Sequence, residues 1–351
     1  MANLLLPLSW LYAVGVTLRN RAFERGLLEV LHLGVPVISV GNIEVGGVGK
    51  TPLVEYIAAH CRRKGKRVGI VSRGYKRKTK GVVVVSDGRS LLTDACGGGD
   101  EPIQIARKMK DAVIVVGERR VDAARVAMEL GAEVVILDDG FQHRYLHRNL
   151  DIVVLDSTRD VTREHLLPAG RMRETLRSVL RAHLIALSHV QSPTDEPLWI
   201  ESLKRPFLGK IVKCRHRPSS LRRGRDDTMV SILELPSHDV LAFSGIDKHE
   251  RFVACVKELG LTVSDSVQFP DHHSYNEKDF QMLGARMGKR GVRACVTTEK
   301  DIARMIKGPE NGMQFLRERD VYYLPVVMEV VEGEPTLIQM IDDCLERRAM
   351  L

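Results

Sequence analysis

A glycine-rich stretch followed by lysine and threonine has the residue types and spacing of a phosphate-binding loop. An apolar run at residues 35–40 predicts a buried strand, and the chain continues as Gly-Gly-Val-Gly-Lys-Thr-Pro at 46–52. Glycines let backbone N–H groups turn toward an anion, and the start of a helix adds about half a positive charge. Lys50 is spaced to reach the β- and γ-phosphates of a nucleotide, and the hydroxyl of Thr51 is spaced to bind Mg²⁺. We therefore predict a nucleotide site at Gly46, Gly47, Val48, Gly49, Lys50, Thr51 and Pro52.

The match to the full phosphate-loop pattern is incomplete. Glu44 stands where that pattern has a glycine six residues before the lysine. The alternative interpretation is a glycine-rich turn that serves packing only. A Lys-Thr pair at a helix start, behind three glycines and an apolar strand, rarely serves packing alone.

A second apolar strand ends in two adjacent carboxylates, Asp138 and Asp139, and Gln142 and His143 follow shortly after. Mg²⁺ prefers carboxylate oxygens beside the phosphates that it neutralises. The motif therefore predicts the metal-organising partner of a phosphate loop. The competing interpretation is an aspartate that only caps a turn.

Two further motifs hold candidate acid–base groups. Asp100 follows three glycines at a predicted helix start, where it is either a helix cap or a base facing the nucleotide. His272 lies in the sequence Asp-His-His at 271–273. That sequence is either a capping aspartate with surface histidines or the source of an imidazole that orients a general base.

The elements that must position these groups alternate between strands and helices, which predicts a doubly wound parallel sheet. With 351 residues the chain is long enough for two domains. The polar, proline-rich stretch at 191–206 marks the boundary. We therefore expect an apolar N-terminal helix at 1–27, a nucleotide-binding domain at 28–200, and a smaller α/β domain at 201–351 that closes the cleft.

The composition limits the classes of partner that the protein is expected to bind. The net charge of +8 suggests nucleic acid, a membrane surface or a phosphorylated substrate as an anionic partner. Aromatic residues make up 5%, which is sparse for a protein that stacks single-stranded bases. The six cysteines have no zinc-type spacing and are typical of reduced thiols in the cytosol.

The N-terminus is almost wholly apolar at residues 4–18, and Arg19, Arg21 and Arg25 follow. Fifteen helical residues rise about 22 Å, short of the roughly 30 Å of a bilayer core. This pattern favours a helix that lies in a membrane interface with its arginines toward the cytoplasm. The alternative is a terminal helix that packs on the protein, and one helix can do both.

Taken in order, these motifs resemble those of the tetraacyldisaccharide 4′-kinases of lipid A biosynthesis, through nearly the whole chain. The shared segments are Val-Pro-Val-Ile-Ser-Val-Gly-Asn (35–42), Gly-Gly-Val-Gly-Lys-Thr-Pro (46–52), Ser-Arg-Gly-Tyr (72–75), Gly-Asp-Glu-Pro (99–102), Asp-Asp-Gly-Phe-Gln-His (138–143), Leu-Pro-Ala-Gly-Arg (167–171), Arg-Glu (173–174), Ala-Phe-Ser-Gly-Ile (242–246), Phe-Pro-Asp-His-His (269–273) and Thr-Thr-Glu-Lys-Asp (297–301). The chain departs from the usual pattern at Val48, at Lys76 and at Asp-Lys-His (247–249).

The resemblance implies a P-loop NTPase-like fold with a second, smaller α/β domain and a membrane-associated N-terminal helix. It implies transfer of the ATP γ-phosphoryl group to the 4′-hydroxyl of a tetraacylated disaccharide 1-phosphate, giving lipid IVA, at the cytoplasmic face of the inner membrane. We expect a monomer that does not bind nucleic acid.

The resemblance also implies roles for single residues. Asp100 is the expected base and His272 its partner. Arg119 and Arg171 are expected to clamp the substrate or the transferred phosphate. The expected surroundings of Mg²⁺ are Thr51, Asp138, Asp139 and Glu174.

Two other function classes remain open from the sequence. A SIMIBI-type nucleotide-switch ATPase or GTPase shares the Gly-Gly-x-Gly-Lys-Thr core, but Val45 stands where such partitioning proteins usually carry a signature lysine. A nucleic-acid-binding protein would suit the charge, but no zinc spacing, basic zipper or RNA-binding aromatic motif supports it.

Overall fold

The computed structural model describes residues 2–204, 207, 209–271, 273–307 and 310–346. The chain divides into two compact units. The first unit holds residues 1–216 and 328–351, and the second holds residues 217–327.

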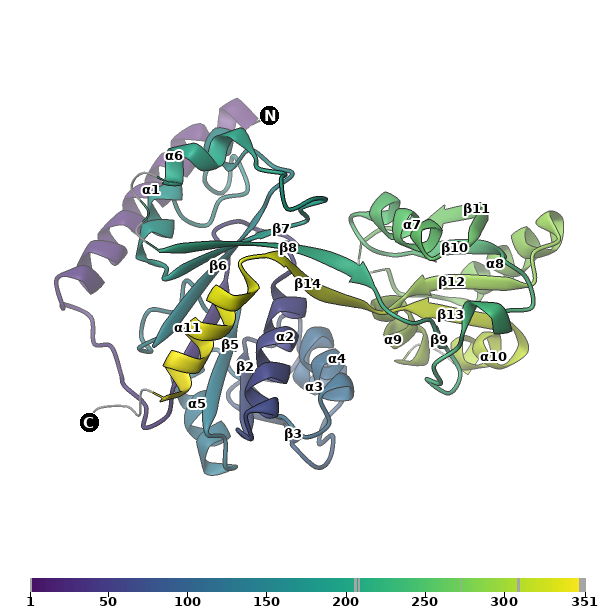
Figure 1. Cartoon of the computed structure of the whole chain (residues 1–351), viewed down its shortest axis with the longest axis horizontal. Helices are drawn as coiled ribbons and strands as arrows, with labels where there is room; N and C mark the ends of the chain where they lie inside the picture. Colours follow the sequence, from purple (N-terminus) through teal and green to yellow (C-terminus); the bar gives the residue numbers. More distant parts are fainter. Residues whose placement is uncertain (1, 205–206, 208, 272, 308–309, 347–351) are drawn as a thin grey trace. The chain divides into compact units, whose positions relative to one another are not determined.

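The first unit is built on a mostly parallel sheet whose edge strand β3 is antiparallel to β4 (Figure 1). Among the described residues, nine strands follow the order β14-β8-β7-β6-β1-β5-β2-β4-β3. Their bounds are β1 Val37–Gly41, β2 Val68–Ser72, β3 Val83–Asp87, β4 Val113–Val116, β5 Val134–Asp138, β6 Leu150–Asp156, β7 Leu184–Ser188, β8 Lys210–Pro218 and β14 Val326–Glu332. Near-continuous Val, Ile and Leu in the fully buried strands β1, β4, β5, β6 and β7 fits a sheet that is covered on both faces.

Helices cover both faces of this sheet, as a doubly wound fold requires. The bounds are α1 Ala2–Glu24, α2 Lys50–Arg63, α3 Ala95–Gly98, α4 Asp100–Lys108, α5 Arg120–Glu129, α6 Glu201–Lys204 and α11 Glu334–Glu346. Apolar side chains of α2, α4 and α11 share one core with one face of the sheet. Side chains of α5 share a separate core with alternate residues of β1, β2, β4 and β5.

The domain boundary that we predicted near residue 200 is wrong in two respects. Strand β8 continues the first sheet, since Leu184 of β7 pairs with Lys210. The chain also returns to the first unit through β14 and α11, where Leu337 and Ile341 join the core beneath α2. The second unit is therefore an insertion at 217–327 and not a C-terminal domain.

The second unit has its own α/β core. Its described strands follow the order β11-β10-β12-β13-β9, in which β9 is antiparallel to β13 and the other pairs are parallel. The bounds are β9 Arg222–Arg223, β10 Asp239–Ser244, α7 His249–Glu258, β11 Thr262–Gln268, α8 Glu277–Arg290, β12 Ala294–Thr298, α9 Glu299–Lys307, α10 Glu310–Glu318 and β13 Asp320–Leu324. The sequence analysis expected a smaller α/β unit of this kind.

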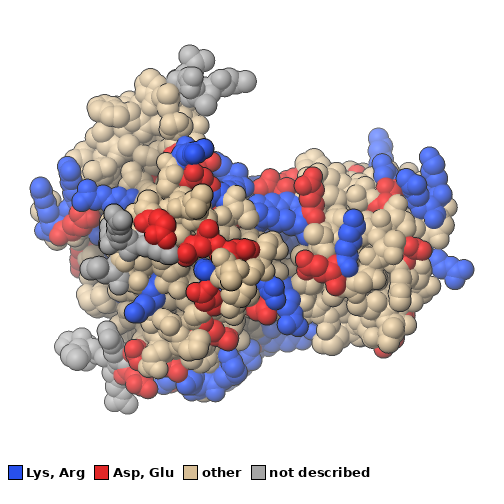
Figure 2. Space-filling view, turned by 45° about the horizontal axis from the view of Figure 1, so that its top comes forward, with Lys and Arg blue, Asp and Glu red and all other residues tan. Residues whose placement is uncertain are grey.

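Helix α1 packs on the first unit with one side and exposes apolar residues on another. Ser9, at 6% exposure, donates a hydrogen bond of 2.9 Å to the carbonyl of Leu166, whereas Trp10 and Leu11 are 68% and 60% exposed. The space-filling view shows an area with few charged side chains at its upper left (Figure 2). No helix in the described part of the chain combines the length and the apolar character needed to cross a bilayer.

Candidate active site

The phosphate loop at residues 42–49 joins β1 to α2, and its backbone requires glycine at two points. Gly46 has a φ of 126° and Gly49 a φ of 90°, which side chains strongly disfavour. A Cβ atom on Gly46 would also lie 2.4 Å from Nη2 of Arg171. Because α2 begins at Lys50, both Lys50 and Thr51 lie in its first turn, where Pro52 is tolerated. The strand, loop and helix thus follow one another as the sequence predicts.

Asp138 is the last residue of β5 and lies beside the strand that leads into the loop. It pairs with Val40 of β1 and is 2% exposed. Burial, followed by the charges of Glu101 and Asp139, raises the pKa of Asp138 to about 7. This carboxyl group therefore changes its protonation near neutral pH.

Asp139 is held between two cations. Its Oδ1 lies 3.4 Å from Nζ of Lys50, and its Oδ2 accepts a hydrogen bond of 2.7 Å from Nη1 of Arg173. Burial opposes ionisation, but Lys50 and Arg173 outweigh it and lower the pKa of Asp139. Asp139 is therefore an anion that joins the loop helix to the segment around Arg173.

Asp100 begins α4 on the side of the site where Asp138 lies. It is exposed, and Gly99 before it has a φ of 90°. The next residue, Glu101, is close enough to raise the pKa of Asp138. His272, the predicted partner of Asp100, lies outside the described residues, so their proximity remains a prediction.

The structure distinguishes Arg119 from its neighbour Arg120. The side chain of Arg119 is 76% exposed and lies 3.4 Å from the surface carboxylate of Asp122. Arg120 is instead desolvated: burial lowers its pKa, while Asp139 and Asp138 oppose that shift. Its buried Nε has no hydrogen-bond partner among the described residues. Arg120 is therefore the desolvated member of the pair and is influenced by the charges of both aspartates, whereas the sequence analysis gave the role of clamping the substrate or phosphate to Arg119.

Arg171 contacts the phosphate loop directly. Its Nη2 and Nε donate hydrogen bonds of 2.9 and 3.2 Å to the carbonyl of Val45. The backbone amide of Val45 in turn donates a bond of 2.8 Å to the carbonyl of Arg171. Arg171 thus braces the first half of the loop.

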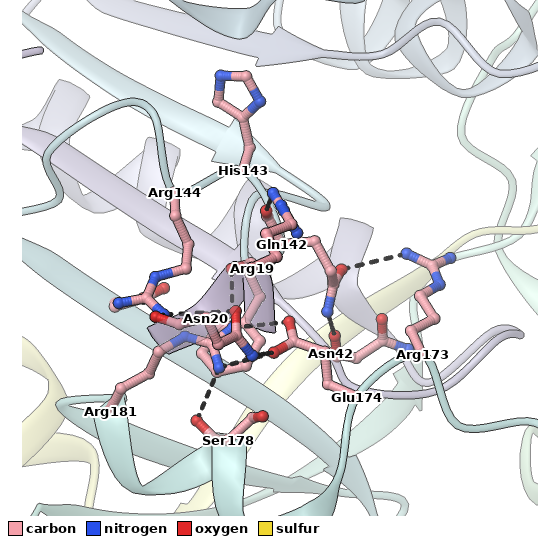
Figure 3. Close-up of polar contacts among 12 residues, drawn as sticks. Arg19, Asn20, Asn42, Gln142, His143, Arg144, Arg173, Glu174, Ser178 and Arg181 are labelled. Atoms are coloured by element: carbon pink, nitrogen blue, oxygen red, sulfur yellow. Dashed lines mark hydrogen bonds and ion pairs between the residues drawn. The ribbon is translucent and has the colours of Figure 1, made fainter. Parts of the chain in front are cut away.

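Glu174 does not fit the predicted role of metal ligand. Its two carboxylate oxygens accept bonds of 2.8 and 2.9 Å from Arg181, and Nδ2 of Asn20 donates a further bond of 2.8 Å (Figure 3). Burial opposes ionisation of Glu174, but Arg181 outweighs it, so the pKa of Glu174 is lowered. The carboxylate is occupied by these donors and joins helix α1 to the site.

Other polar side chains of α1 meet the same segments. Arg19 donates a bond of 2.6 Å to the carbonyl of Gln142, whose side-chain amide donates a bond of 2.7 Å to the carbonyl of Asn42 at the start of the loop (Figure 3). His143 lies beyond these contacts, where burial and then Arg120, Arg148 and Arg19 lower its pKa to about 4. Helix α1 is therefore part of the wall of the site.

No group of three or more His, Cys, Asp or Glu side chains suited to a metal ion occurs among the described residues. Of the four predicted metal ligands, Thr51 and Asp138 flank the loop, Asp139 pairs with Lys50 and Glu174 with Arg181. Thr51 and Asp138 are thus the remaining oxygen donors for a cation.

Comparison with known proteins places this arrangement in a family. The family model described as tetraacyldisaccharide-1-P 4′-kinase, LpxK, matches residues 1–346. The chain belongs to this family. The resemblance that we inferred from the motifs is thereby confirmed, and the nucleotide-switch alternative is not favoured.

Individual relatives match this chain over most of their length. The tetraacyldisaccharide 4′-kinase of Chlorobaculum tepidum is 36% identical, over 99% of this chain and 98% of that protein. The protein of the same name from Anaeromyxobacter dehalogenans is 38% identical, over 84% of this chain and 79% of that protein. A crystal structure of LpxK from Aquifex aeolicus in complex with ATP matches with a TM-score of 0.79 and 33% identity, over 98% of this chain and 99% of that one.

Within this family member, the sequence analysis missed three parts of the site. They are the buried guanidinium of Arg120, the bond from Arg173 to Asp139, and the contacts from Arg19 and Asn20 of α1. The arginine pair at 119–120 was visible in the sequence, but which of the two faces inward depends on the phase of α5. The polar residues at the end of an otherwise apolar helix were a usable signal for its docked side.

Proposed function

We propose that this protein transfers the γ-phosphoryl group of ATP to the 4′-hydroxyl of a tetraacyldisaccharide 1-phosphate, giving lipid IVA. The observation that carries the proposal is the ion pair between Lys50, at the start of the loop helix, and Asp139, next to the buried Asp138. A loop, a lysine and a carboxylate pair in this arrangement serve phosphoryl transfer in P-loop enzymes. Membership of a family described as a 4′-kinase supplies the acceptor.

The nucleotide phosphates would lie on the backbone amides of residues 46–51, with Lys50 neutralising the β- and γ-oxygens. Thr51 and Asp138 would hold Mg²⁺ together with phosphate oxygens and water, which suits a cation that uses one or two protein ligands. When bound, the ion supplies charge neutralisation at the phosphates. Because metal binding requires the carboxylate form of Asp138, whose pKa is raised to about 7, we expect nucleotide–metal affinity to fall below neutral pH.

Asp100 would act as the general base. A sugar hydroxyl is a poor nucleophile near pH 7, so a carboxylate must accept its proton as the new P–O bond forms and ADP leaves. His272 would orient Asp100 or share the proton. Support for Asp100 comes from its place at the start of α4, directly before Glu101, which acts on Asp138.

Arg120 would bind an anionic group of the substrate or of the transition state, because it is desolvated and close to both aspartates. Arg171 would act on the phosphates chiefly through the loop that it braces. Arg119, which is exposed, would at most meet the substrate at the rim.

A radiolabelled ATP assay with the disaccharide 1-phosphate acceptor tests the proposal. We expect Asp100→Ala and Lys50→Ala to lose product formation, and Asp100→Ala to keep ATP binding. Asp111→Ala, a change at an exposed aspartate paired with Arg62, is the matched control. Wild-type turnover of Asp100→Ala would refute the base assignment, and ATP hydrolysis without use of the acceptor would refute the kinase.

Helix α1 would rest on the cytoplasmic face of the inner membrane. Its exposed apolar residues are Leu5, Leu6, Leu8, Trp10, Leu11, Val14 and Leu18. Arg21 and Arg25, which follow these residues along the chain, are also exposed, which suits anionic headgroups. A helix in this position would bring the site to a substrate whose acyl chains stay in the bilayer.

Sedimentation with anionic vesicles tests the membrane contact. The double variant Trp10→Ser, Leu11→Ser should bind vesicles less than wild type does, whereas Leu198→Ser, at a leucine that is 93% exposed elsewhere, should bind normally. Equal binding of all three proteins would contradict the proposal. We further propose that the protein acts as a monomer, which sedimentation velocity in detergent would check.

A further inference from the structure

Polar contacts run along the phosphate loop on the side away from Asp138 and begin at Glu44. This residue is fully buried, and neither carboxylate oxygen has a hydrogen-bond partner among the described residues. The nearest cation is Arg159, whose Nη1 lies 3.7 Å from Oε2 of Glu44 and whose Nε lies 3.7 Å from Oδ2 of Asp156. One arginine therefore bridges the start of the loop and the end of β6.

The contacts continue from β6 to β7. Asp156, which is 1% exposed, lies with Oδ1 3.2 Å from Nδ1 of His189, the residue directly after β7. His189 has a φ of 62°, a conformation that costs free energy in a residue with a side chain and persists only where its surroundings impose it. Its imidazole is thus held at a fixed place at the carboxyl edge of the sheet.

The last contact reaches the end of the loop. The ring of His189 meets that of His216, which belongs to β8, edge to face with centroids 4.7 Å apart. A Cβ atom on Gly49 would lie 2.6 Å from Nε2 and 3.0 Å from Cε1 of His216. The imidazole therefore rests against Gly49, the left-handed residue directly before Lys50.

The topology explains why these residues meet here. From β1 the chain winds through β2, β4 and β5 on one side of β1, and then through β6, β7 and β8 on the other. The winding direction reverses between β1 and β6, and ligands of such sheets bind outside the carboxyl ends of the strands at this reversal. At that point Glu44 follows β1, and Asp156 is the last residue of β6.

We propose that His189 and His216, supported by Asp156 and Arg159, are positioning residues for ATP. They fix Gly49 and hence the place of Lys50 and the amides that follow it. This inference rests on the nucleotide site proposed above. These side chains lie outside the phosphate loop, since they come from β6, from β8 and from the segments that follow β6 and β7.

Binding of a non-hydrolysable ATP analogue, together with separate KM values for ATP and for the lipid acceptor, tests the inference. His216→Ala and His189→Ala should bind the analogue about 10- to 100-fold more weakly, because small displacements of a binding group cost this much. The KM for the acceptor should change much less, whereas kcat at saturating ATP should also fall, because Lys50 neutralises the phosphate oxygens during transfer. His216→Phe, which keeps a ring against Gly49, and His189→Asn, which tolerates a positive φ, should recover most of the affinity.

The controls separate this inference from the nucleotide site itself. His32→Ala, at an exposed histidine before β1, should bind the analogue as wild type does. Lys50→Ala should lose binding, and normal binding by this variant would refute the proposed nucleotide site. If Lys50→Ala loses binding while His216→Ala and His189→Ala keep it, the positioning role is wrong. If either alanine variant fails to fold, Asp156→Asn decides. This change removes the charge beside His189, which should weaken analogue binding, while the side-chain oxygen of asparagine can still accept the hydrogen bond from Oγ1 of Thr158.

Discussion

Lys50 and Asp139 form an ion pair, with Nζ and Oδ1 3.4 Å apart, between the first residue of α2 and the residue that follows β5. The second oxygen of Asp139 is held by Arg173. The pair therefore connects the phosphate loop to the segment that contacts α1, and it sets the direction of the lysine before a nucleotide arrives.

Asp139→Asn should lower kcat about 10- to 100-fold, because loss of one preorganised charged group at a phosphoryl-transfer site lowers the rate by about this factor. Asparagine is chosen because it tolerates the φ of 56° at this position. The free energy of unfolding should also fall at neutral pH, because the lowered pKa of Asp139 means that its ionised form stabilises the folded state. Steady-state kinetics with Asp111→Asn as a surface control measures the effect, and activity within twofold of wild type would show that the pair is dispensable.

Asp138→Asn should make the protein more stable at pH 8. The folded-state pKa of about 7 lies above the usual value for aspartate, so the folded protein binds more protons between pH 4 and pH 7 and loses stability as the pH rises through that window. The amide removes this cost, which the rise in pKa from the usual value to about 7 puts at about 4 kcal/mol above pH 7. Denaturant unfolding of both proteins at pH 8 and pH 5 measures it, and the difference should shrink at the lower pH. If the difference in free energy of unfolding between the two proteins grows on acidification, ionisation of Asp138 does not destabilise the folded state.

The parts of the site that the sequence predicts are those that depend on local chemistry. Gly49, Lys50 and Thr51 are specified by backbone conformation and a helix start, and Asp138 by the end of an apolar strand. Such patterns are complete within a few residues. The alternation of strands and helices likewise predicts the doubly wound sheet.

The parts that sequence analysis could not predict depend on partners far along the chain. Glu174 looks like a metal ligand until Asn20, 154 residues away, and Arg181 are seen to occupy it. The return of β14 and α11 to the first unit has no local signal, because their apolar faces would suit either core. His189 and His216 gain their place from the order of β7 and β8 in the sheet.

Arg120→Ala should lower kcat/KM for the lipid acceptor about 100-fold, as expected for loss of a desolvated, charge-assisted contact. Arg119→Ala should lower it less than fivefold, because an exposed guanidinium paired with Asp122 contributes little. Arg125→Ala, at an exposed site on the same helix, is the control. A larger loss of kcat/KM in Arg119→Ala than in Arg120→Ala would support the sequence-based prediction that Arg119 binds the substrate or phosphate.

Asn20→Ala should separate the two roles of helix α1. The variant loses the bond of 2.8 Å to Glu174, so the free energy of unfolding should fall by about 1 kcal/mol and turnover should fall several-fold. Asn20→Asp should be worse, because it places a second carboxylate beside Glu174. Vesicle binding should stay at the wild-type level in both, because the exposed apolar residues of α1 are unchanged.

The reciprocal variant Trp10→Ser, Leu11→Ser completes this comparison. It should bind vesicles weakly yet turn over a detergent-dispersed acceptor normally, since neither side chain is among those that bond to the site. Turnover and vesicle sedimentation, measured side by side on the Asn20 and Trp10/Leu11 variants, show whether the docked side and the exposed side of α1 have separate roles. If the Asn20 variants keep full turnover, the polar side of α1 serves only to attach the helix. If they lose vesicle binding and turnover together, the docked and exposed sides of α1 act as one unit, and the helix has a single role.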